Sequence, residues 1–95
     1  MDFLLKEGFS ESLINQLIKQ YDKTIIQEFI LEEENVKDII HYFRTIGIKR
    51  IDDLLLTRIT IFTKDINDVK DAFLKHNIKK AVDEINEDID LIDFV

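Results

Sequence analysis

The side chains of this chain that could do acid–base or metal chemistry are few. The two histidines, His41 and His76, have no cysteine beside them and lack the His-x3-His spacing of a zinc site. Each lies near the C-terminal end of a segment that we expect to be helical, where a positive charge is favoured. We therefore expect both histidines to be structural residues at a helix edge, and we predict no metal site.

Other chemistry is equally poorly supported. The acidic run 83–90 lacks the turn glycine and the twelfth-position glutamate of a calcium loop, so we expect a solvated helix face. Ser10 and Ser12 have no base placed beside them, and Ser10 suits the N-cap of a helix. No glycine-rich loop is present to hold phosphate. We predict that the chain is not an enzyme, has no catalytic residue and uses no cofactor.

Charge is distributed in three blocks. Residues 1–34 carry three lysines against eight acids, residues 35–64 carry six cations against three aspartates, and residues 65–95 carry four lysines against nine acids. Clustered positive charge is typical of proteins that bind phosphate groups. Because the central block is basic, nucleic acid is an alternative ligand. The candidate phosphate-contacting residues are Arg44, Lys49, Arg50, Lys79 and Lys80.

Composition places the chain among small globular proteins. It has 95 residues, of which 45% are hydrophobic and 35% charged, with a net charge of −7 and no cysteine. We expect a single domain over 1–95. The beginning of the sequence does not resemble a signal peptide, and no stretch approaches the roughly 20 apolar residues of a membrane span. We expect an acidic, cytoplasmic protein without a membrane segment.

The sequence predicts three helix ends that share one pattern. In each, an apolar residue is followed four positions later by Gly or Asn, and another apolar residue comes directly after. This is the spacing of a Schellman cap, in which the Gly or Asn turns left-handed and the next residue folds back. We therefore expect the same backbone corner three times. The three stops are Leu4…Gly8-Phe9, Phe43…Gly47-Ile48 and Phe73…Asn77-Ile78.

Apolar spacing between these corners predicts an all-α fold, a compact array of six to seven short helices. Residues 58–62 are rich in β-branched side chains but have no second strand to pair with, so we expect an extended or 3₁₀ connection. Residues 32–34 could be helical and fuse the helices on either side. The predicted helices span 11–20, 24–31, 36–46, 50–57, 66–76 and 79–87.

A repeat with a period of 30 relates segment 36–65 to segment 66–95 without gaps. Phe43 aligns with Phe73, and Asp53 aligns with Asp83. Asn35 and Asp65, which precede the two units, are both good N-cap residues. A period near 30 is typical of stacked helix–turn–helix units, and stacking would bring Lys49-Arg50 and Lys79-Lys80 to one edge.

The pattern Phe43-x3-Gly47-Ile48-x2-Ile51…Leu54-Leu55-x3-Ile59-x-Ile61-Phe62 resembles one repeat of the mitochondrial transcription termination factor family. The resemblance covers residues 36–95 and implies a solenoid of helix pairs that binds nucleic acid. It would place the five candidate cations against phosphates. Ile59 and Ile89 stand where that family usually has proline, and this chain contains none.

A second pattern, Leu4-x3-Gly8-Phe9…Leu13-x3-Leu17, resembles the start of a ubiquitin-associated domain. The resemblance covers residues 4–31. It implies a glycine-containing loop that contacts a hydrophobic patch on a partner protein, although Phe9 also suits the role of packing on Leu4 as a cap.

The chain ends in an apolar segment, 89–95, which either folds back as a cap or contacts a partner. We expect the side chains of Leu91, Ile92 and Phe94 to be exposed, and this expectation supports the leading hypothesis. The chain is then a non-catalytic interaction module that binds another protein or a second copy of itself. The alternative hypothesis is nucleic-acid binding through a basic band of the helical repeat, formed by Arg44, Lys49, Arg50, Lys79 and Lys80.

Overall fold

Seven α-helices and two 3₁₀ helices, with no strand, make up the computed structural model, which describes residues 1–95. The all-α fold predicted from the sequence is confirmed. The elements in chain order are α1 (Asp2–Lys6), α2 (Glu11–Gln20), α3 (Lys23–Leu31), α4 (Glu33–Ile46), α5 (Ile51–Thr57), η1 (Ile59–Thr63), α6 (Ile66–His76), α7 (Ile78–Glu87) and η2 (Ile89–Phe94).

Two of the predicted helix starts have side-chain caps. The Ser10 hydroxyl accepts a hydrogen bond from Leu13 N at 3.1 Å, and Asp65 accepts one from Asn67 N at 2.7 Å. Each bond satisfies one of the backbone N–H groups that the first turn of a helix leaves free. The predicted caps at Ser10 and Asp65 are therefore confirmed, and α2 spans the predicted residues.

Two of the three predicted corners are Schellman caps. At Gly8, Phe9 N donates to Leu4 O and Gly8 N donates to Leu5 O, both at 3.0 Å. At Gly47 the same two bonds reach Phe43 O and Arg44 O. The glycines have φ values of +95° and +99°, a left-handed conformation that costs a residue with a Cβ roughly 1–2 kcal/mol.

The third corner differs from the prediction. Asn77 has a φ of +76°, as expected, but its ψ is 108°, against 18° at Gly47. Its carboxamide oxygen accepts from Lys80 N at 3.3 Å, so Asn77 is the N-cap of α7 and Ile78 is already helical. The prediction of one corner repeated three times is wrong here, because an asparagine side chain can begin a helix as well as end one.

The prediction that Asn35 is an N-cap is also wrong. Helix α4 begins at Glu33, because Glu32 O already accepts a hydrogen bond from Val36 N. Glu32 N in turn donates to Glu28 O, so α3 and α4 are separated by that single residue. This outcome is close to the alternative in which residues 32–34 fuse the two helices.

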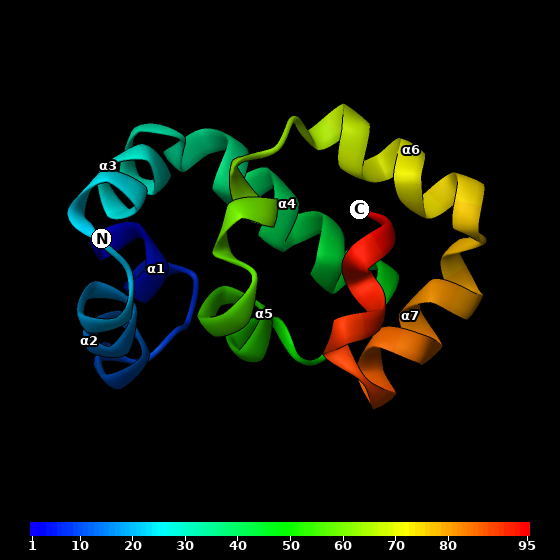
Figure 1. The fold of residues 1–95 in the computed structure, drawn as a ribbon, viewed down its shortest axis with the longest axis horizontal. Helices are drawn as coiled ribbons and strands as arrows, with labels where there is room; N and C mark the ends of the chain where they lie inside the picture. Colours follow the sequence, from blue (N-terminus) through cyan, green and yellow to red (C-terminus); the bar gives the residue numbers. More distant parts are fainter.

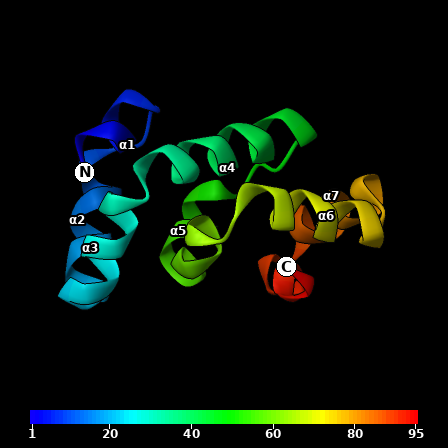
Figure 2. The same ribbon diagram turned by 90° about the horizontal axis from the view of Figure 1, so that it is seen from above.

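Helix α4 runs through the middle of the molecule, with α1, α2 and α3 at one end and α6 and α7 at the other (Figures 1 and 2). Its contacts include α3, η1, α6 and α7. The molecule measures 34 × 24 × 22 Å along its principal axes. All 24 buried residues are hydrophobic and form a single cluster.

An aromatic row lies along this cluster. Phe43 on α4 packs against Phe62 of η1 with ring centroids 5.6 Å apart and against Phe73 of α6 at 5.7 Å. Phe73 continues to Phe94 of η2 at 5.1 Å, edge to face. The 3₁₀ segments are therefore held by side-chain packing, which explains why the β-branched run around Ile59 is not a strand.

The order of helix, helix and 3₁₀ helix occurs twice, first as α4, α5 and η1 and then as α6, α7 and η2. The connection between the paired helices differs, however. It spans residues 47–50 in the first set and only Asn77 in the second. The two sets therefore differ in the length of their connection although their order of elements is the same.

Candidate functional site

The C-terminal segment folds back onto the protein. Ile92 is fully buried, and Phe94 is half-buried against Phe73. Arg58 holds the segment by ion pairs to Asp90 at 2.9 Å and Asp93 at 3.2 Å, which raise the pKa of its guanidinium. The premise of an exposed apolar tail is therefore wrong for Ile92 and largely wrong for Phe94. Of the three candidate residues, Leu91 alone is exposed, at 46%.

The two basic pairs are not brought to one edge. Lys49 N donates to Asn86 Oδ1 at 2.9 Å, and Arg50 reaches Glu87 O, so this pair lies at the C-terminal end of α7. Lys79 and Lys80 stand in the first turn of the same helix, about 10 Å away along its axis. The prediction that stacking unites the pairs is wrong, because they lie at opposite ends of α7.

Carboxylates lie beside Arg50, Lys79 and Lys80. Arg50 pairs with Asp53 at 3.0 Å, and Lys80 approaches Glu84 at 4.0 Å. Lys79 and Lys80 line a shallow depression together with Asp83, Glu84 and Glu87. Alternating charge of this kind weakens the attraction for a phosphate backbone.

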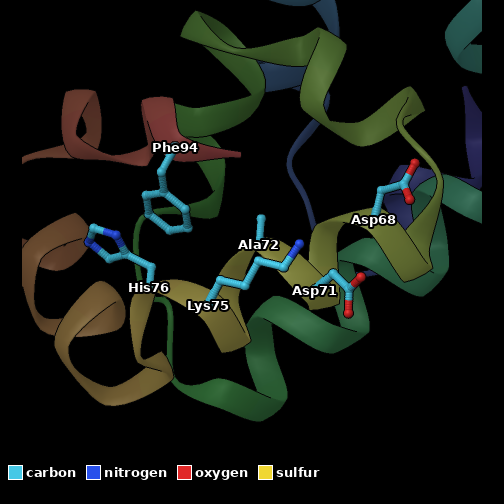
Figure 3. Close-up of a pocket in the computed structure, with 6 residues that line it drawn as sticks. All are labelled: Asp68, Asp71, Ala72, Lys75, His76 and Phe94. Carbon is cyan, nitrogen blue, oxygen red and sulfur yellow. The ribbon is translucent and has the colours of Figure 1, made fainter.

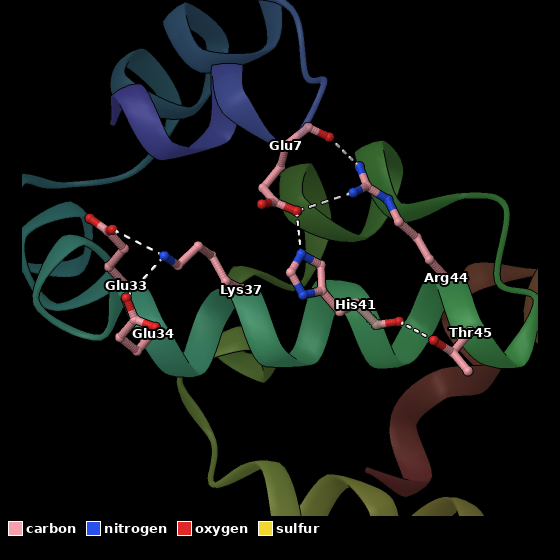
Figure 4. A network of polar contacts seen from close by, with 7 residues as sticks. All are labelled: Glu7, Glu33, Glu34, Lys37, His41, Arg44 and Thr45. Carbon is pink, nitrogen blue, oxygen red and sulfur yellow. Dashed lines mark hydrogen bonds and ion pairs between the residues drawn. The ribbon is translucent and has the colours of Figure 1, made fainter.

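Arg44 belongs to a polar cluster that joins α1 to α4 (Figure 4). Its guanidinium donates to the Glu7 carboxylate at 3.2 Å and to Glu7 O at 2.6 Å, and it lies over the Phe9 ring at 5.2 Å. His41 contacts the same carboxylate. The Glu7 side chain is only 15% exposed, so both side chains serve to anchor the Gly8 corner.

His76 lines a depression on α6 with Asp68, Asp71, Ala72, Lys75 and Phe94 (Figure 3). Its ring stacks on Phe94, with centroids 4.2 Å apart and planes within 4°. His76 Nε2 is buried without a hydrogen-bond partner, and it lies 3.6 Å from a Glu84 oxygen. No serine, threonine or cysteine lines the depression, so it holds no nucleophile of that kind beside the imidazole.

Three polar side chains connect distant elements through hydrogen bonds that the sequence analysis did not predict. Asn35 donates to Phe62 O and Lys64 O and accepts from Ile66 N. Asn86 donates to Gly47 O at 3.1 Å and accepts from Lys49 N. The Tyr21 hydroxyl donates to Leu56 O at 2.6 Å at the end of α5. Their partners lie 27–39 residues away, so no local pattern indicates them.

Exposed apolar side chains gather at the N-terminal end of the molecule. Six large hydrophobic residues are exposed, and four of them lie on α1, α2 and α3: Leu5 (41%), Ile18 (52%), Ile30 (40%) and Leu31 (85%). Met1 lines one depression with Leu5 and Ile18 and a second with Ile30, which connects the two. The sequence analysis missed this surface. The one indication of this surface in the sequence was Ile18, an apolar residue that lies beside the buried stripe of α2.

Comparison of the chain with protein-family models, with curated proteins and with solved structures finds no match. The resemblances stated from the sequence therefore stay predictions. No group of three or more potential metal-binding side chains is found, and none of the helices combines the length and apolar character needed to cross a bilayer.

Proposed function

We propose that the chain is a non-catalytic interaction module that binds another protein or a second copy of itself. The observation that carries this proposal is the exposed apolar surface formed by Leu5, Ile18, Ile30 and Leu31 on α1, α2 and α3. Met1 links the depressions that contain Leu5, Ile18 and Ile30, and exposed apolar surface of this kind is typical of protein interaction sites. It replaces the C-terminal segment as the reason for the proposal.

The setting we propose is cytoplasmic, since a chain without cysteine suits a reducing compartment. We do not favour nucleic acid as the ligand, because the candidate cations lie at separate places and three of them pair with acids.

Site-specific photo-crosslinking in cells that produce the protein tests this proposal. A photoreactive residue is placed at Leu31, the most exposed apolar position, and in a matched variant at Asn67, an exposed polar position on α6. We expect discrete protein adducts from position 31 and none from position 67. Sedimentation velocity over a concentration series then shows whether the adduct is a second copy. A monomer at every concentration, with no adduct at position 31 above that at 67, would contradict the proposal.

A further inference from the structure

Helices α1 and α2 form a groove with an apolar floor. Leu5 of α1 and Ile14 and Ile18 of α2 line it together with Met1, and its volume is about 410 Å³. Leu5 is 41% exposed and Ile18 is 52% exposed. Burial of such side chains is what drives most helix docking in water.

The charged side chains that line this groove are both acidic, and the one cationic group in the lining is the α-amino group of Met1. Asp2 and Glu11 are the charged residues that line it, and neither forms an ion pair within the chain. The lysines of this region face elsewhere: Lys6 lines the depression beside Ile30, and Lys19 lies beside Leu56. Two carboxylates against the single ammonium of Met1 leave the lining net negative, and the surrounding residues 1–34 carry three lysines against eight acids.

We propose that this groove binds an amphipathic helix of a partner protein whose apolar row is flanked by lysine or arginine. The inference rests on the proposed interaction function and names the partner's chemistry. An apolar row would fill the groove, and its cations would meet Asp2 and Glu11. The same face of a second copy fits poorly, because residues 1–34 carry a net charge of −5 and would meet their own charge. An anionic membrane surface is disfavoured for the same reason.

The test uses the full chain and two designed 18-residue helical peptides. Both carry the same leucine row at helical spacing, one with lysine and one with glutamate at the flanking positions. Fluorescence anisotropy is expected to show salt-sensitive binding of the lysine peptide and none of the glutamate peptide. Ile18→Asp should weaken binding by at least about tenfold, because it places a charge on the apolar floor. Asp2→Asn/Glu11→Gln should weaken it by roughly three- to tenfold at low salt and little at high salt.

Leu74→Asp is the matched control, since Leu74 is a 63% exposed leucine on α6 and should leave binding unchanged. All substituted positions are exposed, and circular dichroism checks that each variant is folded. Equal binding of the lysine peptide by wild type and by Ile18→Asp, or no binding at all, overturns the inference. Equal binding of both peptides overturns the charge assignment. None of these results decides the photo-crosslinking at Leu31, so the groove can fail while the interaction function stands.

Discussion

At the scale of single residues, the partly buried side-chain amide of Asn35 connects two elements. Its side chain makes hydrogen bonds with Phe62 O, Lys64 O and Ile66 N, which fixes the turn between η1 and α6 against α4. Asn35→Ala leaves these backbone groups without their partner, so we expect a loss of about 1–3 kcal/mol in the free energy of unfolding. Urea unfolding followed by circular dichroism measures it.

The control for that prediction is Asn67→Ala. Asn67 is exposed on α6, and its side chain forms no hydrogen bond, so the expected change lies within about 0.5 kcal/mol. Equal effects of the two substitutions would show that the Asn35 clamp contributes nothing.

Tyr42 gives a pH-dependent prediction. Partial burial raises the pKa of its phenol above the ordinary value of 10.0. In the unfolded chain the phenol loses its proton near its ordinary pKa. The neutral phenol therefore contributes its full stabilisation below that pH, and this contribution is lost as the pH rises toward the pKa of the folded protein. Tyr42→Phe keeps the ring packed edge-on against Phe73 and removes the titration.

We therefore expect wild type and Tyr42→Phe to respond alike to pH between about 7 and 9 and the wild type to lose more stability above about pH 10. Urea unfolding at a series of alkaline pH values checks this. The raised pKa values of Lys37 and Arg58 are common to both proteins and cancel in the difference. Parallel stability curves across the whole range would contradict the assignment.

At the scale of elements, η2 acts as a cap on the C-terminal half of the core. Ile92 is fully buried, whereas its neighbour Leu91 is 46% exposed. Ile92→Ala removes buried methyl groups and leaves a cavity, so we expect a loss of about 2–4 kcal/mol. Leu91→Ala should cost under about 0.5 kcal/mol. Thermal or urea unfolding of the pair measures the difference, and a similar small cost for both would mean that η2 is detached in solution.

Local signals explain which elements could be predicted from the sequence. Ser10, Asp65, Gly8 and Gly47 each act within four residues of their own position, so the ends that they set follow from the sequence. Asn77 could not be resolved in this way, because the choice between ending α6 and beginning α7 depends on how α7 packs.

The candidate site was harder to predict for the same reason. Whether Arg44 is free for a phosphate or held by Glu7 depends on α1 lying beside α4, which no periodicity reveals. Burial of Ile92 likewise requires the position of η2 on α7. The spacing of residues in the sequence therefore indicated which side chains are apolar or charged candidates, but not which residues they contact.

On the scale of the whole molecule, one hydrophobic cluster extends from Phe3 to Ile92. Its members come from every α-helix and both 3₁₀ helices, and the N-terminal helices pack on the later ones through α2 with α5 and α3 with η1. A stack of independent units would instead have contacts only between neighbours along the chain. We therefore expect the molecule to unfold as one cooperative unit.

The two tyrosines make this cooperativity measurable, since the chain contains no tryptophan. Tyr21 reports the junction of α2 with α5 through its hydrogen bond to Leu56 O, and Tyr42 reports α4 against Phe73 of α6. Tyr42→Phe leaves Tyr21 as the single tyrosine reporter, and Tyr21→Phe leaves Tyr42, at a cost of about 1 kcal/mol for the lost hydrogen bond. In each variant we expect the fluorescence and circular dichroism transitions in urea to coincide. If the Tyr21 signal were lost at a lower urea concentration than the helical signal of the same variant, the N-terminal helices would unfold separately, and packing across α5 and η1 would not couple the two ends.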